Sequence, residues 1–411
     1  MTLRNTIKII LSIIMAASLS CQPEAKKLKE GFWRGVFFVN GHEIPFIFEV
    51  LNRDSGNTSV FLINGEDRFE TDKIQYQGDS VTITIELFNR AIKAEYSENS
   101  LYGELIRVNS ESPDKGIPLT AEHGIRERFS GRDDAPAATL EGTWNIELGS
   151  NNAKKSTVGI FRQKGDVAEG SILTTTGDYR FLEGVVNGKE FSLSSFGGSS
   201  PYLVQGEFIS DSTFEGKLVT TSIIATLKGK RNPEAQLPDA YDITSLKKGY
   251  SSINFSFPDL NEKNVSLSDP AYKDKVVILS IMGSWCPNCL DENAFMAEWY
   301  KNNRDRGVEI IALAFELRSD FESAKKSLTG LKKRLGIEYE ILFAGTTSKE
   351  SVAKALPAID GISAFPTTIF IDKKGNVRKI HSGFSGPATG KFYEEYITNF
   401  NSIVDQLLRE D

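Results

Sequence analysis

Two cysteines spaced i, i+3, Cys286 and Cys289, constrain the fold more than any other feature, because of the segments on either side of them. Residues 275–281, just before the pair, form a nearly continuous apolar run, which is typical of a strand buried on both faces of a sheet. Residues 287–304, which begin directly after Cys286 and include Cys289, have the pattern of a helix. Strand-like and helix-like segments alternate from there on, so we predict an α/β sheet with crossover connections over residues 250–411. The other expected strands and helices cover residues 308–315, 319–335, 339–343, 367–372, 377–381 and 390–409.

The spacing of the two cysteines favours reversible disulfide chemistry. If a helix starts at Cys286, both thiols lie on one side of its first turn, and a small disulfide ring can form without unwinding the helix. The unpaired N–H groups and the positive dipole end of that turn favour a thiolate on Cys286. Because the thiolate is the attacking species, we expect Cys286 to be the nucleophile and Cys289 to resolve the mixed disulfide. Pro287 fits the first helical turn, where no backbone N–H is needed.

A Cys-x-x-Cys pair can also be half of a zinc site, and the composition argues against that alternative. The chain has only three cysteines, and its three histidines, His42, His123 and His381, are far apart in sequence. The usual second pair of ligands is therefore missing. We expect no metal, interpret His381 as structural, and expect no cofactor beyond a redox-active disulfide between Cys286 and Cys289.

Residues 31–230 have a different pattern, with β-branched runs such as 81–85 between clusters of Gly, Asn and Asp, which indicates antiparallel all-β structure. Short matches recur at an offset of about 110 residues, which favours an internal duplication. The matches include Gly31-Phe32-Trp33 with Gly142-Thr143-Trp144, Arg68-Phe69 with Arg180-Phe181, and Gly78 with Gly188. We predict two all-β copies, residues 31–129 and 139–230, which form two small barrels or one shared sandwich, and a linker over residues 231–249.

The N-terminus has the pattern of an export signal. A basic start precedes a mostly apolar run over residues 9–19, which is too short to span a bilayer, since a spanning helix needs about 20 residues. Small residues then lead into Cys21, which resembles a bacterial lipobox, where the cysteine carries lipid and becomes the first mature residue. We expect a lipoprotein-type signal peptide over residues 1–20 and a polar tether over residues 21–30. An ordinary secretory signal with an incidental cysteine is the alternative.

Residues 250–411 resemble the thioredoxin superfamily, specifically the membrane-anchored, extracytoplasmic reductases of the TlpA/ResA type. The motifs that carry the resemblance are Phe257-Pro258-Asp259-Leu260, Val265-Ser266-Leu267-Ser268-Asp269, Lys275-Val276-Val277, Trp285-Cys286-Pro287-Asn288-Cys289, Glu292, Phe365-Pro366-Thr367-Thr368-Ile369-Phe370-Ile371-Asp372 and Gly375. The resemblance implies a thiol–disulfide oxidoreductase that reduces disulfides of client proteins outside the cytoplasm. It also implies re-reduction of this chain by a membrane thiol electron donor of the DsbD/CcdA kind.

The resemblance implies roles for individual residues as well. A proline directly before a strand marks the strand's start, and in this family a cis bond between Phe365 and Pro366 packs against the dithiol. Backbone groups at that place pair with the client chain. Trp285 and Pro287 would contact the client next to them, with core packing as the alternative for Trp285. Glu292 would relay a proton between the thiols, the alternative being a solvated residue on the helix surface.

A few positions depart from the patterns of related proteins. Ser280 stands where ordinary thioredoxins have an aspartate six residues before the first cysteine, so that proton acceptor is missing. Asn293 and Ala294 stand where the TlpA/ResA type often has a proline soon after the glutamate. Glu316, at the end of the second buried strand, is a weaker acid–base candidate than Glu292.

Other functions stay open. A peroxiredoxin-like peroxidase needs Thr or Ser three residues before its reactive cysteine, where this chain has Gly283. A ligand- or client-binding lipoprotein with an accessory redox domain would place its main function in the all-β copies. The net charge of −7 argues against a nucleic-acid partner, since such proteins normally present a basic face. We therefore expect disulfide-bearing client proteins and a membrane as partners, with the lipid-anchored chain facing the periplasm of the cell envelope.

Overall fold

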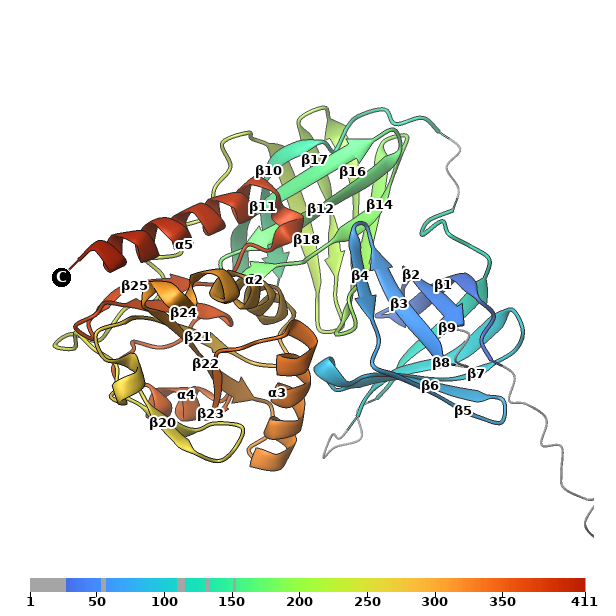
Figure 1. Cartoon of the computed structure of the whole chain (residues 1–411). Helices are drawn as coiled ribbons and strands as arrows, with labels where there is room; N and C mark the ends of the chain where they lie inside the picture. The colour runs from blue at the N-terminus through green and yellow to red at the C-terminus, as the bar shows by residue number, and fades with distance from the viewer. Residues whose placement is uncertain (1–26, 53–56, 109–114, 131–133, 151–152, 411) are drawn as a thin grey trace, which may run out of the picture.

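The computed structural model describes residues 27–410 except 53–56, 109–114, 131–133 and 151–152. The predicted signal peptide, Cys21 and most of the predicted tether lie outside the described residues. The described chain forms two β-sheets followed by an α/β domain, so the all-β and α/β parts occur in the predicted order (Figure 1). None of the described helices is both long and apolar enough to cross a membrane.

The first sheet is an antiparallel meander whose last strand pairs with its first. Its strands are β1 (Gly31–Val39), β2 (His42–Asn52), β3 (Thr58–Asn64), β4 (Asp67–Glu70), β5 (Lys73–Gln77), β6 (Ser80–Ile85), β7 (Arg90–Tyr96), β8 (Ser100–Arg107) and β9 (Ile117–His123), with the 3-10 turn η1 (Glu86–Phe88) after β6. Their order is β4-β3-β2-β1-β9-β8-β7-β6-β5. In β6, Val81, Ile83 and Ile85 are buried while Thr82 and Thr84 are partly exposed, as expected for a strand with one face on a core.

The second sheet repeats this strand order and closes on itself. Its strands are β10 (Gly142–Ser150), β11 (Ala153–Lys164), β12 (Val167–Thr174), β13 (Gly177–Asp178), β14 (Leu182–Asn187), β15 (Glu190–Phe196), β16 (Pro201–Ser210), β17 (Thr213–Val219) and β18 (Ile224–Arg231). Read from β13, the order is β13-β12-β11-β10-β18-β17-β16-β15-β14, and β12 also pairs with β14. We expected either two small barrels or one shared sandwich. The second sheet is a small closed barrel, whereas the first sheet stays open among the described residues.

A tryptophan near the start of each sheet is held in the same way. The indole N–H of Trp33 donates to the carbonyl oxygen of Lys29 at 2.9 Å, and that of Trp144 donates to the carbonyl oxygen of Leu140 at 2.8 Å. Both tryptophans are fully buried. The shared strand order and these equivalent bonds support the predicted duplication, which stays a prediction.

The α/β domain is built on one mixed sheet. Its strands are β21 (Val276–Met282), β22 (Val308–Glu316), β23 (Glu340–Thr346), β24 (Thr367–Ile371) and β25 (Val377–Ser382), and its helices are α2 (Pro287–Asn303), α3 (Phe321–Leu335), α4 (Lys349–Ala355) and α5 (Lys391–Arg409). The order is β23-β22-β21-β24-β25. Strands β21, β22 and β23 are parallel to one another, whereas β24 runs antiparallel to both of its neighbours, β21 and β25. The shorter elements are β19 (Ser256–Pro258), β20 (Asn264–Ser266) and the 3-10 turns η2 (Pro270–Tyr272), η3 (Arg304–Arg306) and η4 (Pro387–Thr389). We did not predict α4 or the β19–β20 hairpin, because such short segments carry no clear periodic signal.

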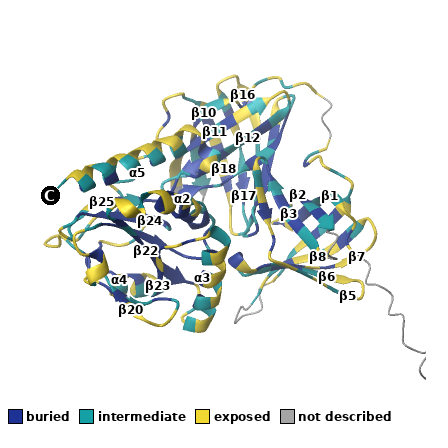
Figure 2. Cartoon of the chain, in the orientation of Figure 1, coloured by how far each residue is buried: buried dark blue, intermediate teal, exposed yellow. Residues whose placement is uncertain are grey.

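Every residue of β21 is buried, which explains its continuous apolar run. Val276 and Ile278 belong to the core under α2, α3 and α5, whereas Val277 and Leu279 belong to the core on the opposite face, with α4. Figure 2 shows this sheet as a buried layer with exposed residues on the outer sides of the helices. The α/β prediction for this part of the chain is confirmed.

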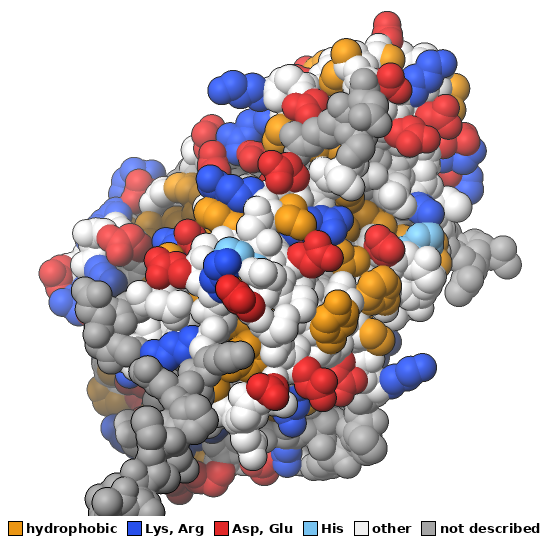
Figure 3. Space-filling view, turned by 90° about the vertical axis from the view of Figure 1, so that its right-hand side faces the viewer, with side chains coloured by type: hydrophobic (Ala, Val, Ile, Leu, Met, Phe, Trp, Pro, Cys, Tyr) orange, Lys and Arg blue, Asp and Glu red, His pale blue; other side chains and the backbone are white. Residues whose placement is uncertain are grey.

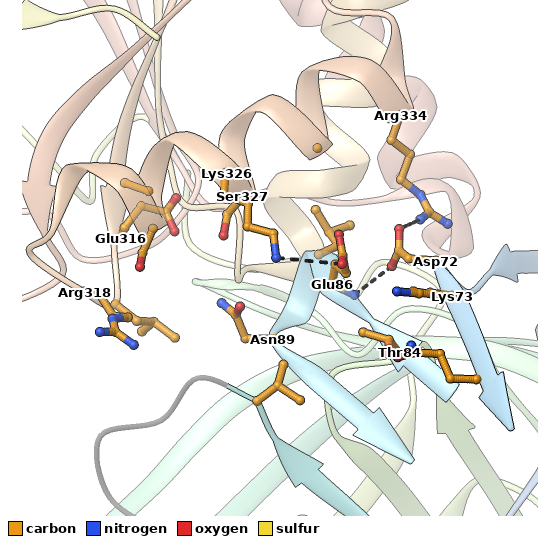
Figure 4. Close-up of a pocket in the computed structure, with 17 residues that line it drawn as sticks. Asp72, Lys73, Thr84, Glu86, Asn89, Glu316, Arg318, Lys326, Ser327 and Arg334 are labelled. Carbon is orange, nitrogen blue, oxygen red and sulfur yellow. Dashed lines mark hydrogen bonds and ion pairs between the residues drawn. The ribbon is translucent and has the colours of Figure 1, made fainter. Parts of the chain in front are cut away.

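The first sheet meets the α/β domain along helix α3. Arg334 of α3 pairs with Asp72 at 3.2 Å and donates to the carbonyl oxygen of Glu70, and Lys326 lies 3.9 Å from Glu86. A cavity of about 290 Å³ lies in this joint, and Figure 4 shows the charged side chains that line it. Acidic and basic side chains are interspersed on the face of the molecule in Figure 3.

Candidate redox site

The two cysteines lie at the start of α2, directly after the buried strand β21. Cys286 is the N-cap of α2 in extended conformation, and its Sγ accepts a hydrogen bond from the N–H of Cys289 at 3.3 Å. Pro287 is the first helical residue, as predicted. Both thiols are free, Cys286 is 5% exposed and Cys289 is fully buried. Burial and the hydrogen bond with Cys286 raise the pKa of Cys289 well above its ordinary value, so Cys289 is held as a neutral thiol.

The loop before β24 contacts the first cysteine. The peptide bond between Phe365 and Pro366 is cis, which confirms that prediction. The thiol of Cys286 donates to the carbonyl oxygen of Phe365 at 3.4 Å. Trp285 donates its indole N–H to the carbonyl oxygen of Phe315 at 2.9 Å, and its ring meets that of Phe365 edge to face at 5.6 Å between centroids. The residues predicted to contact a client therefore lie together around Cys286.

Glu292 is fully buried one turn beyond Cys289, so the interpretation of this residue as a solvated helix glutamate is wrong. Its carboxyl group accepts hydrogen bonds from the hydroxyls of Ser280 at 3.0 Å, Thr368 at 2.6 Å and Tyr396 at 3.0 Å. Burial raises the pKa of Glu292 to about 7, although these three hydrogen bonds oppose the shift. Ser280, at the position where ordinary thioredoxins have an aspartate, thus helps to hold the carboxyl group of Glu292.

Glu316 is also buried, but it contacts the loop before the dithiol. Its carboxylate accepts from the backbone N–H of Ser284 at 2.8 Å and from the hydroxyl of Ser284 at 2.7 Å. Burial raises the pKa of Glu316 against these hydrogen bonds. Because Ser284 precedes Trp285, the contacts favour a role for Glu316 in positioning this loop.

His381 lies on β25, away from the other histidines. It is half-buried, and this burial lowers the pKa of His381 to about 4, while its Nδ1 lies 3.1 Å from the carbonyl oxygen of Gly383. Its ring packs edge to face against Tyr396, one of the donors to Glu292. Within the described part of the chain, no group of three or more His, Cys, Asp or Glu side chains is arranged to hold a metal ion.

Residues of the second sheet reach the dithiol turn, and sequence reasoning missed all of them. The side-chain amide of Asn288 donates to the carbonyl oxygen of Asp178 at 3.3 Å. Arg180 pairs with Asp291 of α2 through two hydrogen bonds of 2.8 and 2.9 Å. Tyr202 of this sheet is close enough to Cys286 for the two groups to interact electrostatically. Burial is the largest cause, and Tyr179 and Cys286 add to it, so that the pKa of Tyr202 is raised to about 12. No local pattern marks these residues, because their partners are about a hundred positions away along the chain.

The arrangement supports two-electron exchange between thiols and disulfides. One cysteine stands at a helix N-terminus, where its sulfur accepts a hydrogen bond from a backbone N–H. A neutral, buried cysteine stands one turn behind it, within reach for a ring-forming disulfide. A buried carboxyl group with a pKa of about 7 lies one further turn along the same helix.

Comparisons with known proteins match the C-terminal part of the chain. A family model described as the AhpC/TSA family matches residues 249–380. The thiol-disulfide oxidoreductase ResA of Bacillus subtilis (strain 168) is 31% identical over 160 residues, which cover 39% of this chain and 77% of that protein. ResA of Geobacillus thermodenitrificans (strain NG80-2) is 30% identical over 140 residues, 34% of this chain and 72% of that protein. A solved thiol:disulfide interchange protein of the thioredoxin family from Chlorobium tepidum TLS is 23% identical, with a TM-score of 0.31, over 40% of this chain and 99% of that one.

The fold and the family match define the C-terminal part as a thioredoxin-like domain with two free cysteines at the start of one helix. Through this domain the chain belongs to the family of ResA-type thiol–disulfide oxidoreductases. The resemblance found in the sequence motifs is confirmed.

Proposed function

We propose that this chain reduces disulfide bonds of client proteins by dithiol exchange at Cys286 and Cys289. The observation that carries the proposal is the unequal placement of the two thiols. Cys286 caps α2 next to the carbonyl oxygen of Phe365, while Cys289 is fully buried behind it with a raised pKa. Such a pair provides one attacking and one resolving sulfur.

The reaction takes two steps and transfers two electrons. The Cys286 thiolate attacks one sulfur of the client disulfide, forms a mixed disulfide and releases the other client sulfur, which takes up a proton. Cys289 then loses its proton and attacks Sγ of Cys286, which releases the second client thiol. The client is reduced to two thiols, and the chain is left with a disulfide between Cys286 and Cys289.

The remaining site residues have supporting roles in this proposal. Glu292 accepts the proton that Cys289 must lose, because it is the buried carboxyl group one turn further along α2 and its pKa of about 7 suits proton transfer near neutral pH. Trp285 and Pro287 contact the client beside Cys286. The backbone at Phe365 and Pro366 pairs with the client chain.

The partners and the location follow the family. A membrane thiol donor of the DsbD/CcdA kind returns two electrons to the disulfide form, and no other cofactor is involved. The chain works on the periplasmic side of the cell envelope, attached through lipid on Cys21. The two β-sheets position the redox domain or hold a client.

A disulfide-reduction assay tests the proposed function. The full-length chain, supplied with dithiothreitol, is expected to accelerate the reduction of insulin disulfides over dithiothreitol alone. With hydrogen peroxide instead, it is expected to consume no more peroxide than a variant with Cys286→Ala and Cys289→Ala, since Gly283 supplies no hydroxyl. Peroxide consumption without insulin reduction would favour the peroxidase, and neither activity would favour the binding lipoprotein.

The proposed anchor gives a separate prediction. Cys21 follows a short apolar run with small residues before it, so the mature protein is expected to incorporate labelled fatty acid and to sediment with membranes. Cys21→Ala is expected to abolish the label. Recovery of the mature wild-type protein in the soluble fraction, with an unmodified Cys21, would contradict the anchor.

A further inference from the structure

The first cysteine of the redox site is almost completely buried. Cys286 is only 5% exposed, although it is the sulfur that must meet a client disulfide. Its neighbours within the α/β domain are the carbonyl oxygen of Phe365 and the N–H of Cys289. Asn288, which stands between the two cysteines, instead contacts the second sheet.

A segment of the second sheet is wedged against this end of α2. It comprises residues 174–180, which we call the cap segment, and runs from the end of β12 through β13 to Arg180. Asn288, between the two cysteines, donates to the carbonyl oxygen of Asp178 at 3.3 Å. Gly177 of the cap segment also lies against Asn288, because a Cβ added to Gly177 would lie 2.9 Å from the Cγ of Asn288.

The cap segment also contacts the loop after β25. The carboxylate of Asp178 accepts a hydrogen bond from the N–H of Gly386 at 2.7 Å. A Cβ on Gly383 would lie 2.9 Å from the carbonyl oxygen of Thr175. The cap segment therefore contacts both the dithiol turn and this loop.

A buried ion pair holds the cap segment in place. Arg180 binds the carboxylate of Asp291 on α2 through two parallel hydrogen bonds, the geometry in which guanidinium and carboxylate bind most strongly. A second carboxylate, Asp67 of the first sheet, lies 3.7 Å from Arg180. Arg180 thus joins the two sheets and the redox helix at one point.

We propose that the second sheet caps the redox site, and that a protein client reaches Cys286 only after the cap segment has separated from α2 and the 383–386 loop. The consequence for clients depends on the proposed function, whereas the contacts of the cap segment with α2 and the 383–386 loop do not. In this proposal the structure is the closed form of the chain. The Arg180–Asp291 ion pair stabilises the closed form and so determines the fraction of molecules in which the cap segment has separated from α2.

Site-resolved alkylation tests the cap without any activity assay. The full-length reduced chain is treated with iodoacetamide, and modification of Cys286 is followed over time by mass spectrometry of its peptide. Gly383→Ala adds a methyl group that meets backbone atoms of the cap segment, which cannot rotate away. Asp291→Asn removes the charge that holds Arg180 while keeping the size of the side chain. Each variant is expected to raise the alkylation rate of Cys286 by about tenfold or more. A tenfold rise corresponds to a loss of about 1.4 kcal/mol in the stability of the closed form relative to the open form.

Gly375→Ala is the matched control. Gly375 lies in the same domain and also has a positive φ, +84° against +79° at Gly383, but an added Cβ there meets nothing within 4 Å. This variant is expected to alkylate at the wild-type rate. Folded Gly383→Ala and Asp291→Asn proteins that also alkylate at the wild-type rate would overturn the proposal.

If neither opening variant folds, the wild-type protein decides. A capped Cys286 reacts at least about tenfold more slowly in the folded chain than in the same chain unfolded in urea, and equal rates overturn the cap. The readout also separates the two proposals. Faster alkylation in variants that reduce no insulin would keep the cap and reject the proposed function.

Discussion

Replacement of Cys286 by alanine is expected to abolish insulin-disulfide reduction by the full-length chain. The loss should be on the order of 10³-fold or more, because a missing nucleophile leaves no covalent route and the fully buried Cys289 cannot replace it. Cys289→Ala is expected to slow turnover as well, since its mixed disulfide has no internal resolving thiol and must wait for attack by dithiothreitol. The measurement is the turbidity of reduced insulin over time.

The isosteric variant Cys286→Ser separates chemistry from packing. It keeps the size of the side chain and an acceptor for the N–H of Cys289, so the helix start should stay intact by circular dichroism. It should nevertheless be as inactive as Cys286→Ala. Substantial activity in either variant would show that Cys286 is not the attacking sulfur.

Glu292→Gln is expected to slow the resolving step by about 10²–10⁴-fold, the usual effect of removing a positioned proton acceptor. The pKa of Glu292 is raised to about 7, so the carboxylate form needed as acceptor grows as the pH rises through 7. The wild-type rate should rise across that pH, and the variant should lose this rise. Stopped-flow measurement of mixed-disulfide decay between pH 5 and 9 checks both.

Glu298→Gln is the matched control for this prediction. Glu298 lies on the same helix, but its side chain is 74% exposed and pairs only weakly with Lys301 at 3.7 Å. It should leave rate and pH profile unchanged. An unaltered rate in Glu292→Gln as well would leave the dithiol mechanism standing and return Glu292 to a structural role.

Stability offers an independent check on the buried Glu292. Its pKa is raised in the folded chain from an ordinary 4.5 to about 7, so its contribution to stability is full below pH 4.5 and is lost as the pH rises through 7. The loss amounts to about 3 kcal/mol, since a tenfold change in proton affinity corresponds to about 1.4 kcal/mol. The wild-type free energy of unfolding should fall over this range relative to that of Glu292→Gln.

The local parts of the redox site could be predicted from the sequence. A strand buried on both faces is a continuous apolar run, and the turn at Cys286 and Pro287 has residues that suit a helix start. A proline directly before an apolar strand likewise marked the start of β24, and the family resemblance of that motif implied the cis bond at Pro366. Each of these signals lies within a few residues of the feature it predicts.

The surroundings of the site could not be predicted, because they depend on how distant segments pack. Glu292 has the spacing of a solvated helix residue, and only the approach of Ser280, Thr368 and Tyr396 buries it. The contacts of Asn288 with Asp178 and of Arg180 with Asp291 join two parts of the chain that have separate sequence patterns. Nothing in either pattern indicates the other partner.

The most direct test of dithiol exchange is to trap its intermediate. Full-length Cys289→Ala and Cys286→Ala chains are incubated with a disulfide-bearing client, quenched with acid, and analysed by non-reducing gels and mass spectrometry of the joined peptides. Mixed disulfides are expected in the Cys289→Ala sample, all joined through Cys286, and almost none in the Cys286→Ala sample. Mixed disulfides joined through Cys289, or equal trapping by both variants, would contradict dithiol exchange through Cys286.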